Sequence, residues 1–276
     1  MVAGTGRGRR ASAGVTTSIP GVRQAYDASA SAWAAGPDAA YGAMADVLIA
    51  AAPTVVAGAR VLDLGTGTGA VARAARRAGA HEIVGVDLAS AMIRAGSGWD
   101  AAVVADAAAL PFAADSFDLV VAGCCLGHLP DPAAALAGAR RLGPALAASA
   151  FQIGWTHPAK ALVDGVAARF GFSAPAWYTR LKTQFEPEVD DPARLQVLAR
   201  SAGYRRVEVS THLVDAGLRT PQELTAWRLG MAHLAPFLAT LEPARRDELR
   251  AQCHRELAQA PPLRVPLVVL AAACGP

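Results

Sequence analysis

A glycine-rich turn with a carboxylate just before it is the first feature of this chain that could do chemistry. Residues 61–69 read VLDLGTGTG, an apolar segment followed by three alternating glycines. Glycines at such a turn let backbone N–H groups approach a ligand where any Cβ would collide. Asp63 adds negative charge, which would repel a pyrophosphate and attract an ammonium or sulfonium group. The turn therefore favours a nucleotide-like ligand with a cationic end.

Two more carboxylates stand at the ends of the next two predicted strands. Asp87 lies 24 residues after Asp63, close to the spacing at which a carboxylate accepts hydrogen bonds from a ribose diol. Asp106 follows the third strand, where it could accept a hydrogen bond from an exocyclic amine such as that of adenine, and Met92 could pack on a flat base. Singly, each aspartate also suits a helix cap or a turn, and Met92 a core. Three successive strand ends together favour a nucleotide site.

The elements that must position these residues alternate between strands and helices. The predicted strands are 60–64, 82–87, 101–104, 117–122, 145–151, 206–210 and 265–274. The predicted helices between them are 70–78, 89–96, 132–142 and 191–202, after two helical patterns within 21–52. The strands lack a period of two, as in a parallel sheet covered on both faces. We therefore expect an α/β fold, a Rossmann-like, doubly wound, mostly parallel sheet of seven strands with helical cap insertions.

Residues 1–18 are rich in Gly, Ala, Ser, Thr and Arg and are predicted to form a disordered tail before one domain at 19–276. Two segments, 156–188 and 213–262, interrupt the alternation and are predicted to form a cap. Aromatic residues are only 6% of the chain but gather near these segments, which suggests a pocket for an apolar or aromatic compound, although a plain core would explain most of them. They are, with one methionine, Trp155, Phe170, Phe172, Trp177, Tyr178, Phe185, Trp227, Met231 and Phe237.

Composition and charge narrow the partners. The 276 residues carry a net charge of only +3 and no basic stripe with interleaved aromatics, so no nucleic-acid partner is expected. The four cysteines show no CxxC or zinc-like spacing, which indicates reduced thiols and no metal site. The run 265–274 is too short to cross a bilayer, and no signal-like apolar segment begins the chain. We expect a cytoplasmic protein without a membrane partner, and homodimer formation is left open.

Together these motifs resemble those of class I S-adenosylmethionine-dependent methyltransferases, particularly the small-molecule branch related to ubiquinone- and menaquinone-biosynthesis methyltransferases. The turn at 61–69 is similar to the first motif of that family, and 86–93 (VDLASAMI) to the second. Residues 106–112 (DAAALPF), 116–121 (SFDLVV) and 126–132 (LGHLPDP) resemble the signatures that follow. The resemblance runs from about Tyr26 to Leu142. It departs at 26–33, where one tryptophan replaces an aromatic-acidic repeat, and at 141–145, where RLGPA replaces a Lys-Pro-Gly-Gly turn.

The resemblance implies transfer of a methyl group from S-adenosylmethionine to an oxygen, nitrogen or carbon of a small molecule, with S-adenosylhomocysteine as product. It implies that Asp63 binds the methionine ammonium, Asp87 the ribose hydroxyls and Asp106 the adenine amine. The segment 26–33 is expected to close over the cofactor. The full set of expected cofactor-binding residues is Tyr26, Trp33, Asp63, Gly65, Thr66, Gly67, Gly69, Asp87, Leu88, Met92, Asp106, Ala107 and Cys124.

His128 is the candidate catalytic residue, a general base just past the fourth strand, although it could instead orient or pack under the loop 127–132. His157, His212 and His233 are weaker candidates near the cap. The main alternative function is a non-methylating enzyme of the same fold that binds S-adenosylmethionine, such as a cyclase. A module that senses the cofactor and a dinucleotide dehydrogenase are further alternatives, the latter disfavoured by Asp63. The alanine- and arginine-rich composition suits natural product biosynthesis in a high-GC bacterium.

Overall fold

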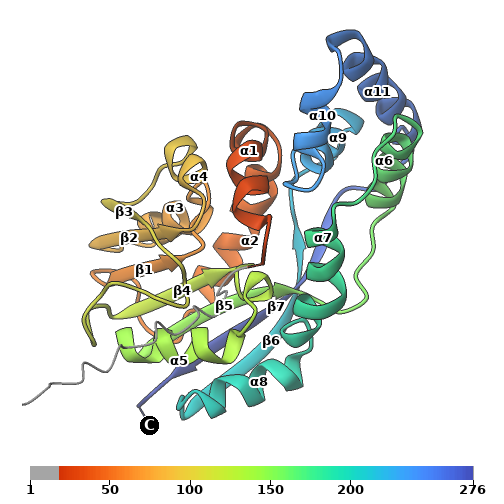
Figure 1. Cartoon of the computed structure of the whole chain (residues 1–276). Coiled ribbons are helices and arrows are strands. Elements are labelled where there is room, and N and C mark those ends of the chain that lie inside the picture. Colours follow the sequence, from red (N-terminus) through yellow and green to blue (C-terminus); the bar gives the residue numbers. More distant parts are fainter. Residues whose placement is uncertain (1–18, 276) are drawn as a thin grey trace, which may run out of the picture.

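The computed structural model describes residues 19–275, which fold around a seven-stranded sheet (Figure 1). The predicted tail, residues 1–18, lies outside the described residues. The strands are β1 (Arg60–Leu64), β2 (Glu82–Asp87), β3 (Ala101–Val104), β4 (Leu119–Gly123), β5 (Ala145–Phe151), β6 (Arg206–Asp215) and β7 (Arg264–Ala273). Their order is β3-β2-β1-β4-β5-β7-β6, and β7 runs antiparallel to both of its neighbours. The predicted α/β fold with a mostly parallel sheet is confirmed.

Most of the helices begin with proline in the first turn, where its missing N–H and fixed φ are tolerated. The α-helices are α1 (Val22–Ala35), α2 (Pro37–Ala50), α3 (Ala70–Arg77), α4 (Ser90–Ala95), α5 (Pro132–Leu142), α6 (Pro158–Arg169), α7 (Ala176–Arg180), α8 (Pro192–Ser201), α9 (Pro221–Leu229), α10 (Ala235–Thr240) and α11 (Pro243–Glu256). Two 3₁₀ turns, η1 (Leu126–His128) and η3 (Glu186–Glu188), and one π-helical turn, η2 (Leu181–Phe185), complete the set.

The central strands are buried on both faces, which explains why they show no period of two. Successive side chains of a strand point to opposite faces of the sheet. Val61 of β1 belongs to the apolar cluster that includes α2 and α3, whereas the adjacent Leu62 belongs to the cluster that includes α5 and α8. Two helical layers therefore enclose the sheet, and the ends of the strands are left for a site.

The outer strand β6 is longer than the predicted segment 206–210. It pairs with β7 along its whole length, from Arg206 opposite Ala273 to Asp215 opposite Arg264. The strand therefore continues past 213, the predicted start of the second cap segment. Exposed and half-buried residues dominate β6 because it lies at the edge of the sheet, and its weaker apolar signal explains the short prediction.

The cap forms from segments that are far apart in the sequence. Helices α6, α9 and α11 contact one another, and α1 contacts α9 and α10. In Figure 1 these cap helices lie together at the upper right, beyond α1. Arg228 of α9 is only 3% exposed and forms a bidentate pair with Asp164 of α6, through contacts of 2.8 and 2.6 Å. Such charge-assisted, two-point pairs join two helices in a defined orientation.

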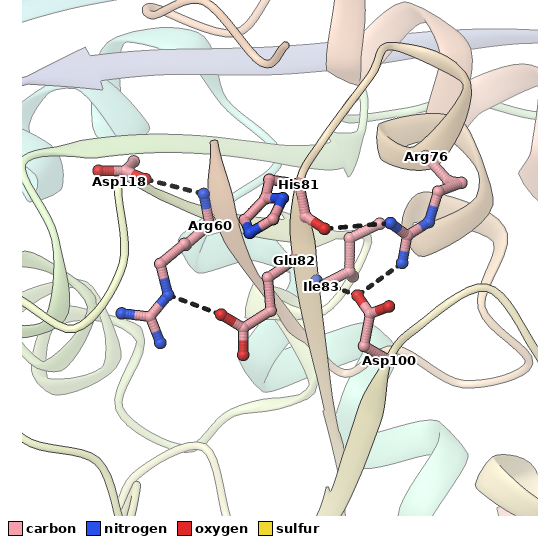
Figure 2. A network of polar contacts seen from close by, with 7 residues as sticks. All are labelled: Arg60, Arg76, His81, Glu82, Ile83, Asp100 and Asp118. Atoms are coloured by element: carbon pink, nitrogen blue, oxygen red, sulfur yellow. Dashed lines mark hydrogen bonds and ion pairs between the residues drawn. The ribbon is translucent and has the colours of Figure 1, made fainter. Parts of the chain in front are cut away.

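At the amino ends of the strands, polar side chains join neighbouring strands of the sheet (Figure 2). Arg60 Nε donates to Glu82 Oε2 at 2.7 Å, which links β1 to β2. Asp100 accepts from the Ile83 amide at 2.7 Å and from Arg76 at 2.5 Å. These two contacts hold the pKa of Asp100 below its ordinary value. This end of the sheet shows pairing between exposed groups and lies away from the carboxyl ends of the strands.

Candidate active site

A cavity of about 150 Å³ opens at the carboxyl ends of β1, β2, β3 and β4. The order of the sheet reverses here, since β1 lies between β2 and β4, and ligands of open α/β sheets bind at such a position. Helices α1 and α2 close the cavity from above the strand ends. The predicted residues that line it are Tyr26, Trp33, Gly65, Thr66, Gly67, Asp87, Leu88, Met92, Asp106, Ala107, Cys124 and His128. We call it the cofactor cavity.

The glycine turn needs glycine for its backbone conformation. Gly65 and Gly67 have φ values of 66° and 56°, in the left-handed region that costs other residues about 1–2 kcal/mol. The Thr66 amide donates to the Val86 carbonyl at 2.9 Å, and the Gly67 amide donates to Asp87 Oδ2 at 2.8 Å. The turn is therefore bound to the end of β2, and its backbone faces the cavity.

Asp87 accepts hydrogen bonds from two backbone amides and keeps further acceptor capacity. Its Oδ1 accepts from the Ala89 amide at 2.8 Å, in addition to the bond from Gly67 to Oδ2. A carboxylate has about four acceptor positions, so lone pairs remain for a ligand in the cavity that Asp87 lines. Burial raises the pKa of Asp87 although the two amides oppose the shift. The residue therefore keeps the capacity to accept hydrogen bonds from a diol, and its role toward a ribose stays a prediction.

Asp63 lies behind the turn and does not line the cavity. The residue is 1% exposed, and Thr66 Oγ1 donates to its Oδ2 at 2.7 Å. Among the described residues, Oδ1 has no hydrogen-bond partner. Burial raises the pKa of Asp63 to about 7. A buried carboxylate with an unpartnered oxygen is costly, and a cationic group nearby would relieve that cost.

Gly69, the other predicted residue that does not line the cavity, has a packing role. A Cβ at Gly69 would lie 1.9 Å from the Ser97 carbonyl oxygen and 2.7 Å from the Trp99 ring, and its φ is 89°. The collision that the glycine avoids is therefore with the protein's own chain. At this position a ligand is not needed to explain the residue type.

Asp106 lines the cavity from a strand end, whereas Met92 and Trp33 line it from helices α4 and α1. Asp106 follows β3 and its Oδ1 accepts from the Ala108 amide at 2.9 Å. Met92 of α4 is 1% exposed, and its Cε would lie 3.5 Å from a Cβ on Gly67, so it packs against the turn. Trp33 of α1 is buried with its ring centroid 5.5 Å from that of Tyr26.

Tyr26 and His128 form a pair that no sequence pattern indicated. Tyr26 Oη lies 2.8 Å from His128 Nε2, which joins α1 to η1 across 102 residues. Burial lowers the pKa of His128. Burial also raises the pKa of Tyr26, and the nearby charge of Asp87 adds to that shift. Both groups are therefore neutral near pH 7, and the imidazole has a lone pair that can take up a proton. Sequence reasoning proposed both residues but for separate roles.

Cys124 sits at the turn after β4 in a strained conformation. Its φ is 51°, in the left-handed region, and its amide donates to the Ser149 carbonyl at 3.1 Å. Burial raises the pKa of the thiol to about 12, so the group is neutral and a poor nucleophile. Strain of this kind persists only where the surrounding structure holds it, and it gathers at functional sites.

A second cavity of about 50 Å³ adjoins the first and shares Tyr26, Tyr41, Met44 and His128 with it. We call it the cap chamber. The predicted cap residues that line it are Trp155, Trp177, Tyr178, Trp227 and Met231, together with His233. Phe170, Phe172, Phe185 and Phe237 do not line it. His157 instead caps α6, accepting from the Ala159 amide at 3.2 Å, and His212 lies 2.8 Å from Ser210 on β6.

Sequence reasoning missed the charged wall of the cap chamber, which consists of Lys160, Lys182, Glu186 and Arg228. A signal was present, because Lys160 and Lys182 are the only two lysines of the chain.

Within residues 19–275, no cluster of three or more His, Cys, Asp or Glu side chains is arranged to hold a metal ion. None of the helices described is long and apolar enough to cross a membrane.

A family model described as a methyltransferase domain matches residues 62–143, from β1 to the end of α5. No curated protein sequence matches the chain. A proposed methyltransferase of Haloferax volcanii, solved in complex with the Trm112 methyltransferase activator, is 20% identical with a TM-score of 0.54, over 92% of this chain and 98% of that one. A proposed methyltransferase from an antibiotic biosynthesis pathway of Anabaena variabilis is 14% identical with a TM-score of 0.51, over 77% and 90%.

A phosphoethanolamine N-methyltransferase of Haemonchus contortus, bound to phosphomonomethylethanolamine and S-adenosylhomocysteine, is 20% identical with a TM-score of 0.47. The match covers 79% of this chain but only 49% of that enzyme, about half of its length. At such identities the structures show the fold alone. The family match spans the glycine turn, the ends of β2, β3 and β4, and His128. It does not confirm the predicted ubiquinone- and menaquinone-type branch. Residues 62–143 therefore match a methyltransferase domain, and the fold around them is one that solved methyltransferase-like structures share.

Proposed function

We propose that the protein transfers a methyl group from S-adenosylmethionine to an oxygen, nitrogen or carbon of a small acceptor held in the cap chamber. One observation carries the proposal: two adjoining cavities share Tyr26 and His128 at their junction. The first has the methyltransferase motifs on its wall, and the second has the cap aromatics. A cofactor and an acceptor bound side by side would meet at this junction.

The residues around the cofactor cavity suit S-adenosylmethionine. Asp87 has acceptor capacity for the ribose hydroxyls, and Asp106 lies at the next strand end for the adenine amine. The unpartnered Oδ1 of Asp63 suits the ammonium group, reached through a bridging water because Asp63 does not line the cavity. Gly67 and Met92 would border the ribose and the base.

The cofactor, when bound, supplies the methyl group on a sulfonium, and its carbon–sulfur bond breaks as the bond to the acceptor forms. The chain contributes alignment, because two ligands held at the junction react as if at very high concentration, worth about 7–11 kcal/mol at best. Tyr26, Trp177 and Tyr178 surround the junction with rings that exclude water. These roles need no covalent step on the protein.

The Tyr26–His128 pair would take the proton that an acceptor hydroxyl or amine must lose. With Nε2 unprotonated, Tyr26 donates its hydroxyl proton to His128 as the acceptor's proton moves to Tyr26 Oη. The imidazole ends with the extra proton and releases it to solvent after product leaves. General bases of this kind contribute about 10²–10⁴ to the rate.

Incubation with methyl-labelled S-adenosylmethionine and a panel of phenols, amines and activated carbon acids tests the proposal. We expect label in one class of acceptor and an equal amount of S-adenosylhomocysteine. Binding of S-adenosylhomocysteine, followed as a thermal shift, is measured in parallel. Binding without label transfer to any class would instead favour the non-methylating alternative, a cyclase-like enzyme that keeps the cofactor intact. Absence of binding would refute both.

A further inference from the structure

The two lysines of the chain lie in one place. Among 26 lysine and arginine residues only Lys160 and Lys182 are lysine, and both line the cap chamber. Lysine differs from arginine in carrying a compact charge whose three donors can turn toward one small group. A chain that otherwise uses arginine therefore places its two compact cations on the wall of one small cavity.

Two of the three cations in the chamber already have carboxylate partners. Lys182 pairs with Glu186, four residues later on the same turn of chain. Arg228 pairs with Asp164 through two contacts. In contrast, Lys160 makes no ion pair with the described residues. Among residues 19–275, the wall therefore presents one positive charge without an ion-pair partner of its own.

Lys160 also has unused hydrogen-bonding capacity. Its Nζ donates to the Trp155 carbonyl at 3.3 Å and lies 4.4 Å from the centroid of the Trp155 ring. One such bond leaves two N–H groups for a ligand. Burial, and then the charges of Lys182 and Arg228, lower the pKa of Lys160 to about 8. The charges of Glu186 and Asp164 oppose this shift, and a bound anion would act in the same direction as these carboxylates.

A second polar group of the chamber lacks a partner. His233 is 4% exposed, and its Nε2 has no hydrogen-bond partner among the described residues. Its ring is stacked on Tyr178, with centroids 3.9 Å apart and planes 3° from parallel. Burial lowers the pKa of His233 to about 2, so the imidazole is neutral and can donate or accept one bond. Buried polar groups of this kind call for an explanation, and a ligand polar group supplies one.

The remaining wall is aromatic. Trp155, Trp177, Tyr178 and Trp227 line the chamber, so three of the five tryptophans of the chain surround it. Phe151 stacks on Trp155 at 5.2 Å with planes 19° apart. Flat rings pack well against flat ligands in offset-stacked or edge-on arrangements.

We propose that the cap chamber binds a planar aromatic compound that carries a carboxylate, with Lys160 as the counterion and His233 as a second polar contact. The identity of this compound as the methyl acceptor rests on the proposed function, but its binding does not. The carboxylate would sit among the unbalanced donors, and the ring among the tryptophans. The reacting hydroxyl or amine would then face Tyr26 and His128.

Matched pairs of probes test the charge directly. The ortho-, meta- and para-hydroxybenzoates are each compared with their amides, which have the same shape without the charge. Binding to the full chain is measured by calorimetry, with and without S-adenosylhomocysteine. We expect at least one carboxylate to bind about tenfold or more tightly than its amide, the size of a charge-assisted hydrogen bond. Failure of every carboxylate to bind better than its amide, or to bind at all, would overturn the proposal.

Two substitutions at one position show whether Lys160 is the counterion. Lys160→Gln should remove the preference for carboxylate, and Lys160→Arg should keep most of it. Thermal unfolding and S-adenosylhomocysteine affinity should stay near the wild-type values in both, which separates a lost contact from a lost fold. A preference that survives in Lys160→Gln would refute the assignment. Carboxylate binding that persists when S-adenosylhomocysteine does not bind would leave this inference standing and refute the proposed function.

Discussion

The two cavities that meet at Tyr26 and His128 are built in opposite ways. The cofactor cavity is made of backbone turns and carboxylates at consecutive strand ends, with Asp87 and Asp106 on its wall and Asp63 behind it. The cap chamber is made of side chains from helices distant in sequence, and its ionised wall is mostly cationic. Their charges are thus opposite, which suits a cationic cofactor in one and an anionic acceptor in the other. Local chain segments build the first cavity, and tertiary packing builds the second.

Removal of the imidazole at the junction should have the largest effect. This effect should be on turnover alone. We expect His128→Ala to lower kcat by about 10²–10⁴, with nearly unchanged affinity for S-adenosylhomocysteine. Because burial lowers the pKa of His128, the acidic limb of kcat/KM in the wild type should lie below pH 6.5. Tyr26→Phe keeps the ring and removes only the hydroxyl of the relay, so it should also lower kcat while the packing at the junction stays intact. An equal loss of cofactor affinity in His128→Ala would mean that the residue shapes the cofactor cavity instead.

Ionisation of Asp63, behind the glycine turn of the cofactor cavity, should lower the free energy of unfolding. Its pKa of about 7 lies above the ordinary 3.8, so the folded state holds this proton more tightly than the unfolded state. The stability that the protonated form provides is complete below about pH 4 and is lost as pH rises through about 7. At pH 8 the cost of ionisation approaches about 4 kcal/mol, an upper bound from about 1.4 kcal/mol for each pH unit between these two values.

Asp63→Asn should therefore raise the free energy of unfolding of the ligand-free protein at pH 8 and change it little at pH 4. Urea unfolding at the two pH values measures the difference. The same substitution should weaken S-adenosylhomocysteine binding by about tenfold or more, because the carboxylate no longer attracts the ammonium through the bridging water. Increased stability with unchanged binding would assign Asp63 to the fold and remove it from the cofactor site.

The sequence allowed the cofactor cavity to be predicted because its groups follow the chain. The ends of β1, β2 and β3 come one after another, each with its aspartate, and parallel strands bring their carboxyl ends to one edge. The Tyr26–His128 contact could not be predicted, since it depends on how α1 lies over η1. The same holds for Lys160 of α6 and His233 of the turn between α9 and α10, which line one chamber only when the cap packs. Gly69 shows the converse, because a motif position proved to serve packing within the chain.

Two cap aromatics that look alike in the sequence should behave differently. Trp177 lines the cap chamber, whereas Phe237 does not and packs on Phe172 with ring centroids 5.4 Å apart. We expect Trp177→Ala to raise the KM of the acceptor by about tenfold, as one lost aromatic contact of about 1.5 kcal/mol implies, with little change in cofactor affinity. Phe237→Ala should lower thermal stability and leave that KM unchanged. Equal effects of both substitutions on KM would mean that the cap acts as one packed unit without a defined chamber.

The smallest effect should come from the far end of the sheet, where polar groups support neither cavity. Glu82 pairs with Arg60 at 2.7 Å, and both side chains are more than a third exposed. Exposed pairs contribute about 0–1 kcal/mol because water screens the charges and ordering the side chains costs entropy. Glu82→Gln should therefore change the free energy of unfolding by less than about 1 kcal/mol and leave both cofactor affinity and turnover at wild-type values. A measurable loss of turnover would show that the beginnings of β1 and β2 are coupled to the glycine turn at their other end. The polar groups at the far end of the sheet would then support the cofactor cavity after all.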